Sequence, residues 1–291
     1  MANVSVVTGA NSGIGRATAI YLAQQGSSVV GTVRDRARAA KLEAMAADAG
    51  VTIPLVELDV ADDASVAAGF AEIFDRFGPV DVLVNNAGVG STGTVEDCTA
   101  ADYLAVMNVN LCGAVRCLQQ VLPSMRERRT GTIVNITSVT GKFASPAQAS
   151  YTASKWAFEG LSEELALEVA SFGIRVVIIE PGVTKSAIFA KNVDTPDTTG
   201  AYDTQYRRLF DFYGAGIANA TDPFEVAALV HHAVTTDEPR LRYSCSWGAR
   251  ELIEARPLVS DDDWVALGRL DDDSDYRDEF KRLFGLDISP S

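Results

Sequence analysis

Histidine and cysteine are scarce in this sequence. Its 291 residues include two histidines and four cysteines. The cysteines form no Cys-x-x-Cys pair and no spacing with histidine that is typical of a zinc site. We therefore expect no metal centre, and we expect free thiols of the kind found in the reducing cytoplasm. The four positions are Cys98, Cys112, Cys117 and Cys245.

Positive charge and long apolar runs are also lacking. Against 25 lysines and arginines stand 39 acidic residues, for a formal net charge of −14. This balance argues against nucleic acid or an anionic membrane surface as a partner. No apolar run approaches the ~18 residues of a membrane span. An apolar strand pattern begins almost at Met1, so we expect no signal peptide either.

What the chain does have is a large apolar fraction in a regular pattern. Hydrophobic residues make up 47% of the sequence, which is enough for a sizeable core. Short apolar runs alternate with stretches of helical periodicity, and this alternation predicts an α/β fold. We expect one domain over residues 1–291, with a doubly wound, Rossmann-type parallel sheet of about seven strands and helices on both faces. Strands are predicted at 4–8, 29–33, 53–58, 80–84, 131–136, 176–179 and 240–246, and helices at 17–22, 37–49, 62–77, from about 99, from 151, 202–218 and 223–235.

A glycine-rich turn follows the first predicted strand and opens the first helix. Glycines 9 and 13 allow a tight turn and a close approach to a pyrophosphate, while the third glycine allows close helix–strand packing. The free N–H groups of the helix N-terminus favour phosphate binding. The pattern predicts a dinucleotide site formed by Gly9, Asn11, Ser12, Gly13, Ile14 and Gly15.

The end of the second strand carries a cation where a carboxylate would favour NAD. Val33 ends the strand and Arg34 follows, with Asp35 one step further on. A guanidinium there can bind a ribose 2′-phosphate through charge-assisted hydrogen bonds. We therefore predict NADP(H) over NAD(H). The alternative is that Arg34 is a solvated side chain in the arginine-rich start of the next helix.

The stretch from Ser138 to Lys155 carries the candidate chemistry. Tyr151 and Lys155 are four residues apart, so on a helix they share one face. A nearby ammonium stabilises a phenolate, which brings the tyrosine closer to the pKa range useful for general acid–base catalysis. Ser138 can donate a hydrogen bond that fixes a substrate oxygen beside the phenol. Taken alone, the pair can also be an ordinary helical i,i+4 contact.

Several other candidate residues fall at predicted strand ends, where ligands bind in doubly wound sheets. These are the glycine turn, Asp59-Val60, Asn86-Ala87-Gly88 and Ser138. With these residues in place, the sequence resembles the short-chain dehydrogenase/reductase family. The resemblance covers roughly residues 3–190. The carrying motifs are Thr8-Gly9-x3-Gly13-x-Gly15, Asn85-Asn86-Ala87-Gly88, Asn110 in Asn-Val-Asn-Leu-Cys-Gly, Ser138, Tyr151-x3-Lys155 and Glu180-Pro181-Gly182.

The resemblance implies a role for each matched residue. Tyr151 is the general acid or base, and Ser138 orients the substrate oxygen. Lys155 lowers the Tyr151 pKa and binds the nicotinamide ribose. Asn110, inside the helix that starts near Thr99, helps to hold a water that relays protons. The cofactor is lined by Asp59, Val60, Asn86, Ala87 and Gly88 and by Pro181, Gly182, Val183 and Thr184, with Thr184 or Ser186 bonding the carboxamide.

The remaining chain is expected to cover the substrate and to extend the core. Residues 185–220 are predicted to form a substrate lid, and its aromatic side chains suggest a bulky apolar substrate such as a steroid, terpenoid or other alicyclic ketone, or else simply pack the lid. Residues 247–291, the C-terminal extension, resemble the family branch acting on hydroxysteroids and retinoids. Its acidic clusters at 261–263 and 271–275 invite a calcium hypothesis, but helix N-caps explain them better.

Three functions stay open at this point. The first is an NADP(H)-dependent alcohol dehydrogenase or ketoreductase that interconverts a hydrophobic secondary alcohol and a ketone. The second is a 3-oxoacyl-thioester reductase, against which the negative charge argues mildly. The third is a non-catalytic dinucleotide sensor, although sensors typically lose the Tyr–Lys pair that this chain keeps. The resemblance further implies a homodimer or homotetramer formed through the helices that start near Thr99 and Ser150.

Overall fold

The computed structural model is built on one twisted parallel sheet, and it describes residues 3–185, 193–194 and 199–289. The sheet has seven strands in the order β3-β2-β1-β4-β6-β7-β9, every pair of them parallel. The order reverses between β1 and β4, which is where doubly wound sheets bind ligands. The strands are β1 Val4–Val7, β2 Ser28–Val33, β3 Leu55–Glu57, β4 Val82–Asn85, β6 Gly131–Ile136, β7 Ile174–Pro181 and β9 Arg242–Cys245.

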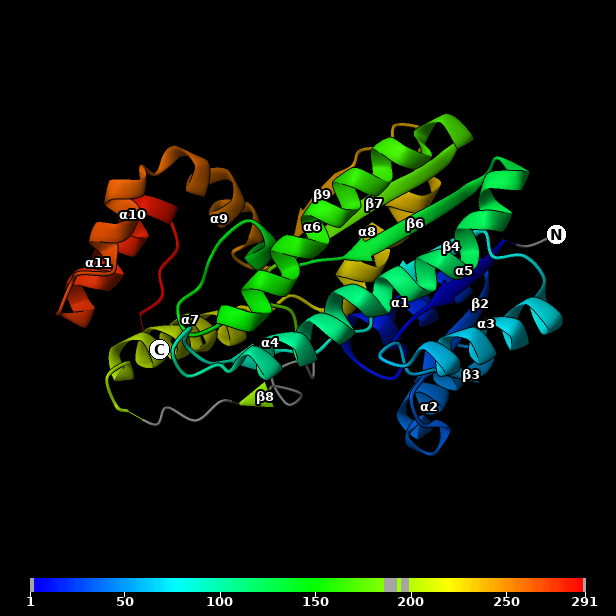
Figure 1. Ribbon diagram of the computed structural model, residues 1–291, viewed down its shortest axis with the longest axis horizontal. Helices are drawn as coiled ribbons and strands as arrows, with labels where there is room; N and C mark the ends of the chain where they lie inside the picture. Colours follow the sequence, from blue (N-terminus) through cyan, green and yellow to red (C-terminus); the bar gives the residue numbers. More distant parts are fainter. Residues whose placement is uncertain (1–2, 186–192, 195–198, 290–291) are drawn as a thin grey trace.

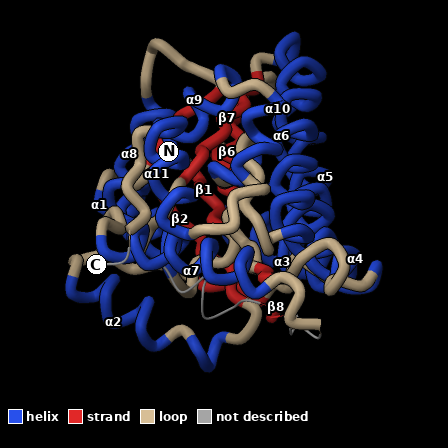
Figure 2. The backbone as a smooth tube through the Cα atoms, turned by 90° about the vertical axis from the view of Figure 1, so that its left-hand side faces the viewer, coloured by secondary structure: helices blue, strands red, loops and turns tan. Residues whose placement is uncertain are grey.

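Helices cover both faces of the sheet (Figure 2). On one face α1 (Gly13–Gln24), α2 (Ala40–Asp48) and α8 (Pro223–Thr235) enclose a core that contains Ile20, Leu42 and Val230. On the other, α3 (Asp63–Phe77), α5 (Gly113–Arg128) and α6 (Ala149–Val169) enclose a second core around Phe70, Met125 and Leu165. Burying one side chain of this size contributes roughly 1.5–3 kcal/mol, so the two cores fix the sheet rigidly. The expected Rossmann-type fold is confirmed.

Several predicted elements differ in detail from the structure. The helix expected at 37–49 is divided into a 3₁₀ turn, Arg36–Arg38, and α2, because the Asp35 side chain caps the turn. The strand expected at 53–58 is shorter, Leu55–Glu57. The long helix expected from Thr99 is interrupted, with α4 (Ala100–Met107) and α5 joined by a π-helical turn, η2 (Asn108–Cys112). Such turns insert one extra residue and redirect side chains, and here the turn contains Asn110.

The C-terminal region forms a third, separate core at one end of the molecule. Figure 1 shows α9, α10 and α11 gathered there beside α7. This core is rich in aromatic rings, with Phe143, Phe212, Tyr276, Phe280 and Phe284 all buried. A short two-stranded sheet of β5 and β8 lies apart from the main sheet. The two strands of this small sheet are β5 Ser91–Thr92 and β8 Val193–Asp194. The helices around the third core are α7 Asp203–Ala218, α9 Ala249–Ala255, α10 Asp261–Leu267 and α11 Asp273–Phe284.

The two acidic stretches of this region lie at helix starts. The Asp272 side chain accepts hydrogen bonds from the backbone N–H groups of Ser274 and Asp275 at the start of α11. At α10 the cap is Ser260, which accepts from the N–H of Asp263, and the acids fill the first turn. Both arrangements favour helix formation, because the N-terminal end of a helix is electropositive. Within the described ranges, no helix is long and apolar enough to cross a bilayer.

Candidate active site

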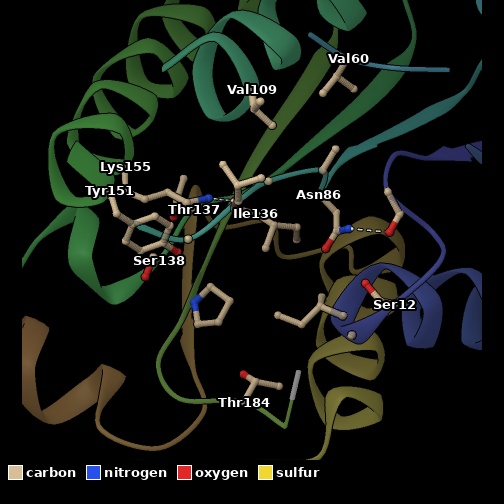
Figure 3. Close-up of a pocket in the computed structure, with 18 of the residues that line it drawn as sticks. Ser12, Val60, Asn86, Val109, Ile136, Thr137, Ser138, Tyr151, Lys155 and Thr184 are labelled. Atoms are coloured by element: carbon tan, nitrogen blue, oxygen red, sulfur yellow. Dashed lines mark hydrogen bonds between the residues drawn. The ribbon is translucent and has the colours of Figure 1, made fainter. Parts of the chain in front are cut away.

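A cavity of about 760 Å³ opens at the carboxyl ends of the central strands (Figure 3). Nearly all of the predicted site residues line it. Gly15 and Asn110 lie just behind its wall, and Ser186 falls outside the residues that the structure describes. The predicted residues that line the cavity are Gly9, Asn11, Ser12, Gly13, Ile14, Arg34, Asp59, Val60, Asn86, Ala87, Gly88, Ser138, Tyr151, Lys155, Pro181, Gly182, Val183 and Thr184.

The glycine turn is shaped by steric exclusion. A Cβ atom at Gly15 would lie 2.2 Å from Asn86 Nδ2, and one at Gly9 would lie 2.9 Å from the Cα of Ala87. Gly9 and Gly13 also have φ values of +66° and +53°, which residues other than glycine rarely adopt. The turn therefore presses against the Asn86-Ala87 segment and leaves its outer side open. A side chain at Gly15 would therefore clash with Asn86 and with the Gly9 carbonyl.

Thr8 joins the ends of β1 and β4 beneath this turn. Its Oγ1 accepts hydrogen bonds from the backbone N–H groups of Asn86 (2.9 Å) and Ala87 (3.0 Å). The Asn86 amide donates in return to the Thr8 carbonyl at 2.9 Å. These bonds cross the point where the strand order reverses, so they fix the cavity floor at the place where a cofactor would lie.

The Asn110 side chain is fully engaged by its neighbours. Its amide donates to the Val89 carbonyl and to Ser154 Oγ, each at 3.0 Å, and its Oδ1 accepts from the Val89 N–H at 2.9 Å. Asn110 thus ties the π-helical turn to the segment after β4 and to α6. These contacts indicate that its side chain positions the cavity wall, one layer behind Tyr151 and Lys155.

Ser138 and Tyr151 lie on the wall opposite Asn86 and Ser12 (Figure 3). Together with Thr140, which also lines the cavity, they form the hydroxyl cluster. Thr140 Oγ1 donates to Ser138 Oγ at 3.0 Å. Burial raises the pKa of the Tyr151 phenol, while its hydrogen bonds with Ser138 and Thr140 act in the opposite direction. The protein alone thus raises the Tyr151 pKa that Lys155 was expected to lower. A positive charge in the cavity beside the phenol would oppose this effect.

Lys155 is held on the same face of α6 as Tyr151. Its ammonium donates to the Ile136 carbonyl at 3.1 Å and lies 5.7 Å from the ring centroids of Tyr151 and Phe158. Burial lowers the Lys155 pKa to about 8, although the carboxylate of Glu159 works against this. The group therefore carries its positive charge near neutral pH and loses it in mildly alkaline solution.

The far end of the cavity has the features that an adenosine phosphate requires. Arg36 pairs with Glu72 (3.1 Å) and Arg38 with Asp35 (3.4 Å), whereas no ion pair within the described ranges involves Arg34. Arg34 is exposed and lines the cavity at the end of β2. The buried Oδ1 of Asn11, also on the wall, has no hydrogen-bond partner among the described residues. With the open side of the glycine turn, these residues fit a phosphorylated dinucleotide.

The other end of the cavity is closed by residues distant in the sequence. Phe212 and Tyr213 reach it from α7, Val139 from the segment after β6, and Gln148 from the turn before α6. Gln148 donates a hydrogen bond to the Tyr213 hydroxyl and so joins two walls. Gln148 and Thr140 could not be predicted from the sequence. Their only signal was proximity to Tyr151 and Ser138, which many residues share.

Curated relatives of this chain include enzymes whose names refer to steroids and retinol. It is 39% identical to mouse 17-beta-hydroxysteroid dehydrogenase type 1 over 253 residues, which cover 82% of this chain and 72% of that protein. It is 36% identical to bovine retinol dehydrogenase 8 over 255 residues, covering 81% of this chain and 79% of that one.

Solved structures of similar fold include other dehydrogenases and reductases. A short-chain dehydrogenase from Streptomyces avermitilis matches with a TM-score of 0.78 and 32% identity, over 94% of this chain and 99% of that one. A variant of actinorhodin polyketide ketoreductase, crystallised with NADPH, matches with a TM-score of 0.72 and 30% identity, over 85% and 97% of the two chains. The family model described as short chain dehydrogenase matches residues 3–197. The chain belongs to the short-chain dehydrogenase/reductase family, and its relatives include the hydroxysteroid and retinol dehydrogenases.

Proposed function

We propose that this protein is an NADP(H)-dependent oxidoreductase that interconverts a hydrophobic secondary alcohol and its ketone. The observation that carries the proposal is the placement of Ser138, Tyr151 and Lys155 on one wall of a cavity whose far end holds the glycine turn and Arg34. Proton-transferring groups and a phosphate-binding turn in one cavity suit hydride transfer better than hydrolysis or binding alone. The intact catalytic set also favours an enzyme over a dinucleotide sensor.

In the proposed reaction each side chain has one task. A bound nicotinamide supplies or accepts the hydride. The Tyr151 hydroxyl gives a proton to the ketone oxygen during reduction and takes it back during oxidation. Ser138 donates a hydrogen bond that holds the substrate oxygen beside Tyr151. Lys155 contributes the positive charge that favours the phenolate, and Asn110 keeps the wall behind them in place.

The choice of NADP(H) rests on Arg34. Its guanidinium is exposed at the end of β2 and lines the cavity, so a 2′-phosphate there gains charge-assisted hydrogen bonds. The NADPH in the polyketide ketoreductase structure supports the same class of cofactor. A ribose 2′-hydroxyl without a phosphate would leave Arg34 with little to bind.

The substrate is proposed to be a bulky alicyclic ketone or alcohol such as a steroid or terpenoid. Val139, Val183 and Phe212 offer apolar surface next to the hydroxyl cluster, and Tyr213 and Gln148 add a polar edge. The names of the steroid and retinol relatives support a hydrophobic substrate.

The proposal is tested by following nicotinamide absorbance with NADPH and NADH over a panel of a 17-ketosteroid, a monoterpene ketone, an acyl thioester and cyclohexanone. We expect turnover of the alicyclic ketones with NADPH at least tenfold faster than with NADH. Turnover confined to the acyl thioester would contradict the substrate class. Tight NADPH binding without turnover of any ketone would contradict the enzymatic role.

We further propose a homodimer or homotetramer. Leu104 on α4 and Trp156 and Leu167 on α6 are large apolar side chains that are 50–79% exposed in the single chain. Their burial between copies would remove this apolar surface from water. Light scattering at micromolar concentration checks the prediction, and a monomer would contradict it. We also propose a cytoplasmic location, since the four cysteines, all within the described residues, form no disulfide.

A further inference from the structure

A buried arginine on α7, Arg208, is paired with the C-terminal extension. Arg208 is only 4% exposed. Its Nε donates to Asp273 Oδ1 at 3.1 Å and its Nη2 donates to the Leu270 carbonyl at 2.5 Å. Its guanidinium also lies 4.2 Å from the ring centroid of Tyr276. All of these partners lie in or just before α11, so the position of α7 depends on that helix.

Asp273 holds more than one partner. Its second oxygen accepts from Arg207 Nε at 3.1 Å, and farther along the two helices Arg277 pairs with Asp211 at 3.0 Å. A buried cation that loses its carboxylate becomes strongly unfavourable, because nothing then compensates for its lost hydration. Removing the Asp273 charge should therefore displace Arg208 and the part of α7 that carries it.

The same part of α7 forms the wall of the substrate end. Phe212 is one helical turn beyond Arg208 and lines the cavity together with Tyr213. Phe212 also packs on Trp247 and Phe280, with ring centroids 5.4 and 6.4 Å away. On the other side, the extension holds the segment after Ser138, because the Phe143 ring lies 5.3 Å from those of Trp264 and Phe284.

We propose that the Arg208–Asp273 pair is a specificity-determining positioning pair, through which the C-terminal extension sets the substrate end of the cavity around bulky ketones. Neither residue lines the cavity, so the pair acts through Phe212 and Tyr213. This inference rests on the proposed function for its substrate class, but the position of α7 can be tested without any substrate.

The kinetic test compares Asp273→Asn with Asp287→Asn, each assayed with NADPH and either a 17-ketosteroid or cyclohexanone. Asp287 is a matched control because its ion pair with Lys281 lies in the same extension and is exposed. For Asp273→Asn we expect a rise in the steroid KM of about tenfold with kcat changed less than threefold. Cyclohexanone kcat/KM and the NADPH dissociation constant should change less than twofold, since small ketones and cofactor do not need the α7 wall. Asp273→Glu, which keeps the charge, should recover most of the loss.

Hydrogen exchange gives a second readout that requires no substrate. In Asp273→Asn, peptides from α7 and from residues 139–148 should exchange at least threefold faster than in wild type, while Asp287→Asn leaves both unchanged. Unchanged exchange in these peptides, or equal loss of activity for steroid and cyclohexanone, would overturn the positioning role. If wild type reduces neither ketone, the proposed function fails for them, and the exchange result alone still decides whether the pair positions α7.

Discussion

The two ends of the cavity are built in different ways. The cofactor end consists of backbone turns at the ends of β1 and β4, where Gly9 and Gly15 leave no room for a side chain. The substrate end is enclosed by side chains from α7, from the segment after β6 and from the aromatic core of the extension. The first depends on contacts between the ends of two neighbouring strands, β1 and β4, and the second on side-chain contacts between helices and loops outside the sheet.

Because of this difference, the two ends tolerate different substitutions. A Cβ at Gly15 would meet the Asn86 amide and the Gly9 carbonyl, both of them fixed by the sheet. At the substrate end, aromatic rings and ion pairs can be exchanged for others of similar volume without disturbing the sheet. The cofactor end is thus constrained by geometry, whereas the substrate end can be adapted to different molecules. The wall that carries Ser138, Tyr151 and Lys155 lies where the two ends meet.

The largest expected effect comes from Tyr151, on the wall where the two ends of the cavity meet. Tyr151→Phe removes the hydroxyl proposed to transfer the proton, and general acid–base catalysis is worth about 10²–10⁴-fold. We expect ketone reduction to fall at least 10³-fold while the NADPH dissociation constant changes less than twofold. Tyr103→Phe, a change on α4, serves as the control and should keep wild-type rates. A Tyr151→Phe enzyme within tenfold of wild type would exclude the proposed acid.

Lys155→Met is expected to lower activity about 10²-fold and to change its pH dependence. Oxidation requires the Tyr151 phenolate, whose pKa burial raises, so kcat/KM for oxidation should rise with pH. Removing the ammonium raises the Tyr151 pKa further, so the rise of kcat/KM for oxidation should move to higher pH. Because burial lowers the Lys155 pKa to about 8, wild type itself loses this cation at higher pH. The rate difference between wild type and variant should therefore shrink above pH 8, and a constant ratio from pH 6 to 10 would disagree with this account.

The cofactor end could be predicted from the sequence because its physical requirements are local. Positive φ at Gly9 and Gly13, and the cation at position 34, follow from short motifs beside an apolar strand. The fold was predictable for the same reason, since each strand and helix has its own period. The placement of Asn110 in a π-helical turn was not, because the extra residue leaves no mark in the hydrophobic pattern.

Arg34→Ala tests the cofactor end alone. We expect the KM for NADPH to rise about tenfold and that for NADH to change less than twofold, because only the first carries a 2′-phosphate for the guanidinium to bind. Arg36→Ala is the matched control, since Arg36 is occupied by Glu72. Steady-state kinetics with both cofactors measure the effect. An equal loss for NADH and NADPH would show that Arg34 has no part in selecting the cofactor.

The substrate end could be predicted only in outline. The aromatic residues of α7 indicated an apolar wall, but which of them face the cavity depends on the register of α7 against α11. That register is fixed by the Arg208–Asp273 pair and by Tyr276. The hydrogen bond between Gln148 and Tyr213 joins residues 65 positions apart, and Gln148 has no sequence signal of its own. Long-range contacts of this kind have no local pattern.

The smallest expected effect lies at the start of α11, next to that pair. Asp272→Ala removes a cap that accepts two backbone hydrogen bonds, which costs about 1 kcal/mol and lowers Tm by about 2 °C. Its exposed neighbour Asp271 accepts neither of those bonds, so Asp271→Ala should leave Tm unchanged. Calorimetry with and without Ca²⁺ separates a cap from a cation site, because a cap is indifferent to Ca²⁺. Loss of the cap should fray only the first turn of α11, so Asp272→Ala should raise the steroid KM less than Asp273→Asn does. An equal rise would mean that the whole start of α11, rather than the charge of Asp273, positions α7.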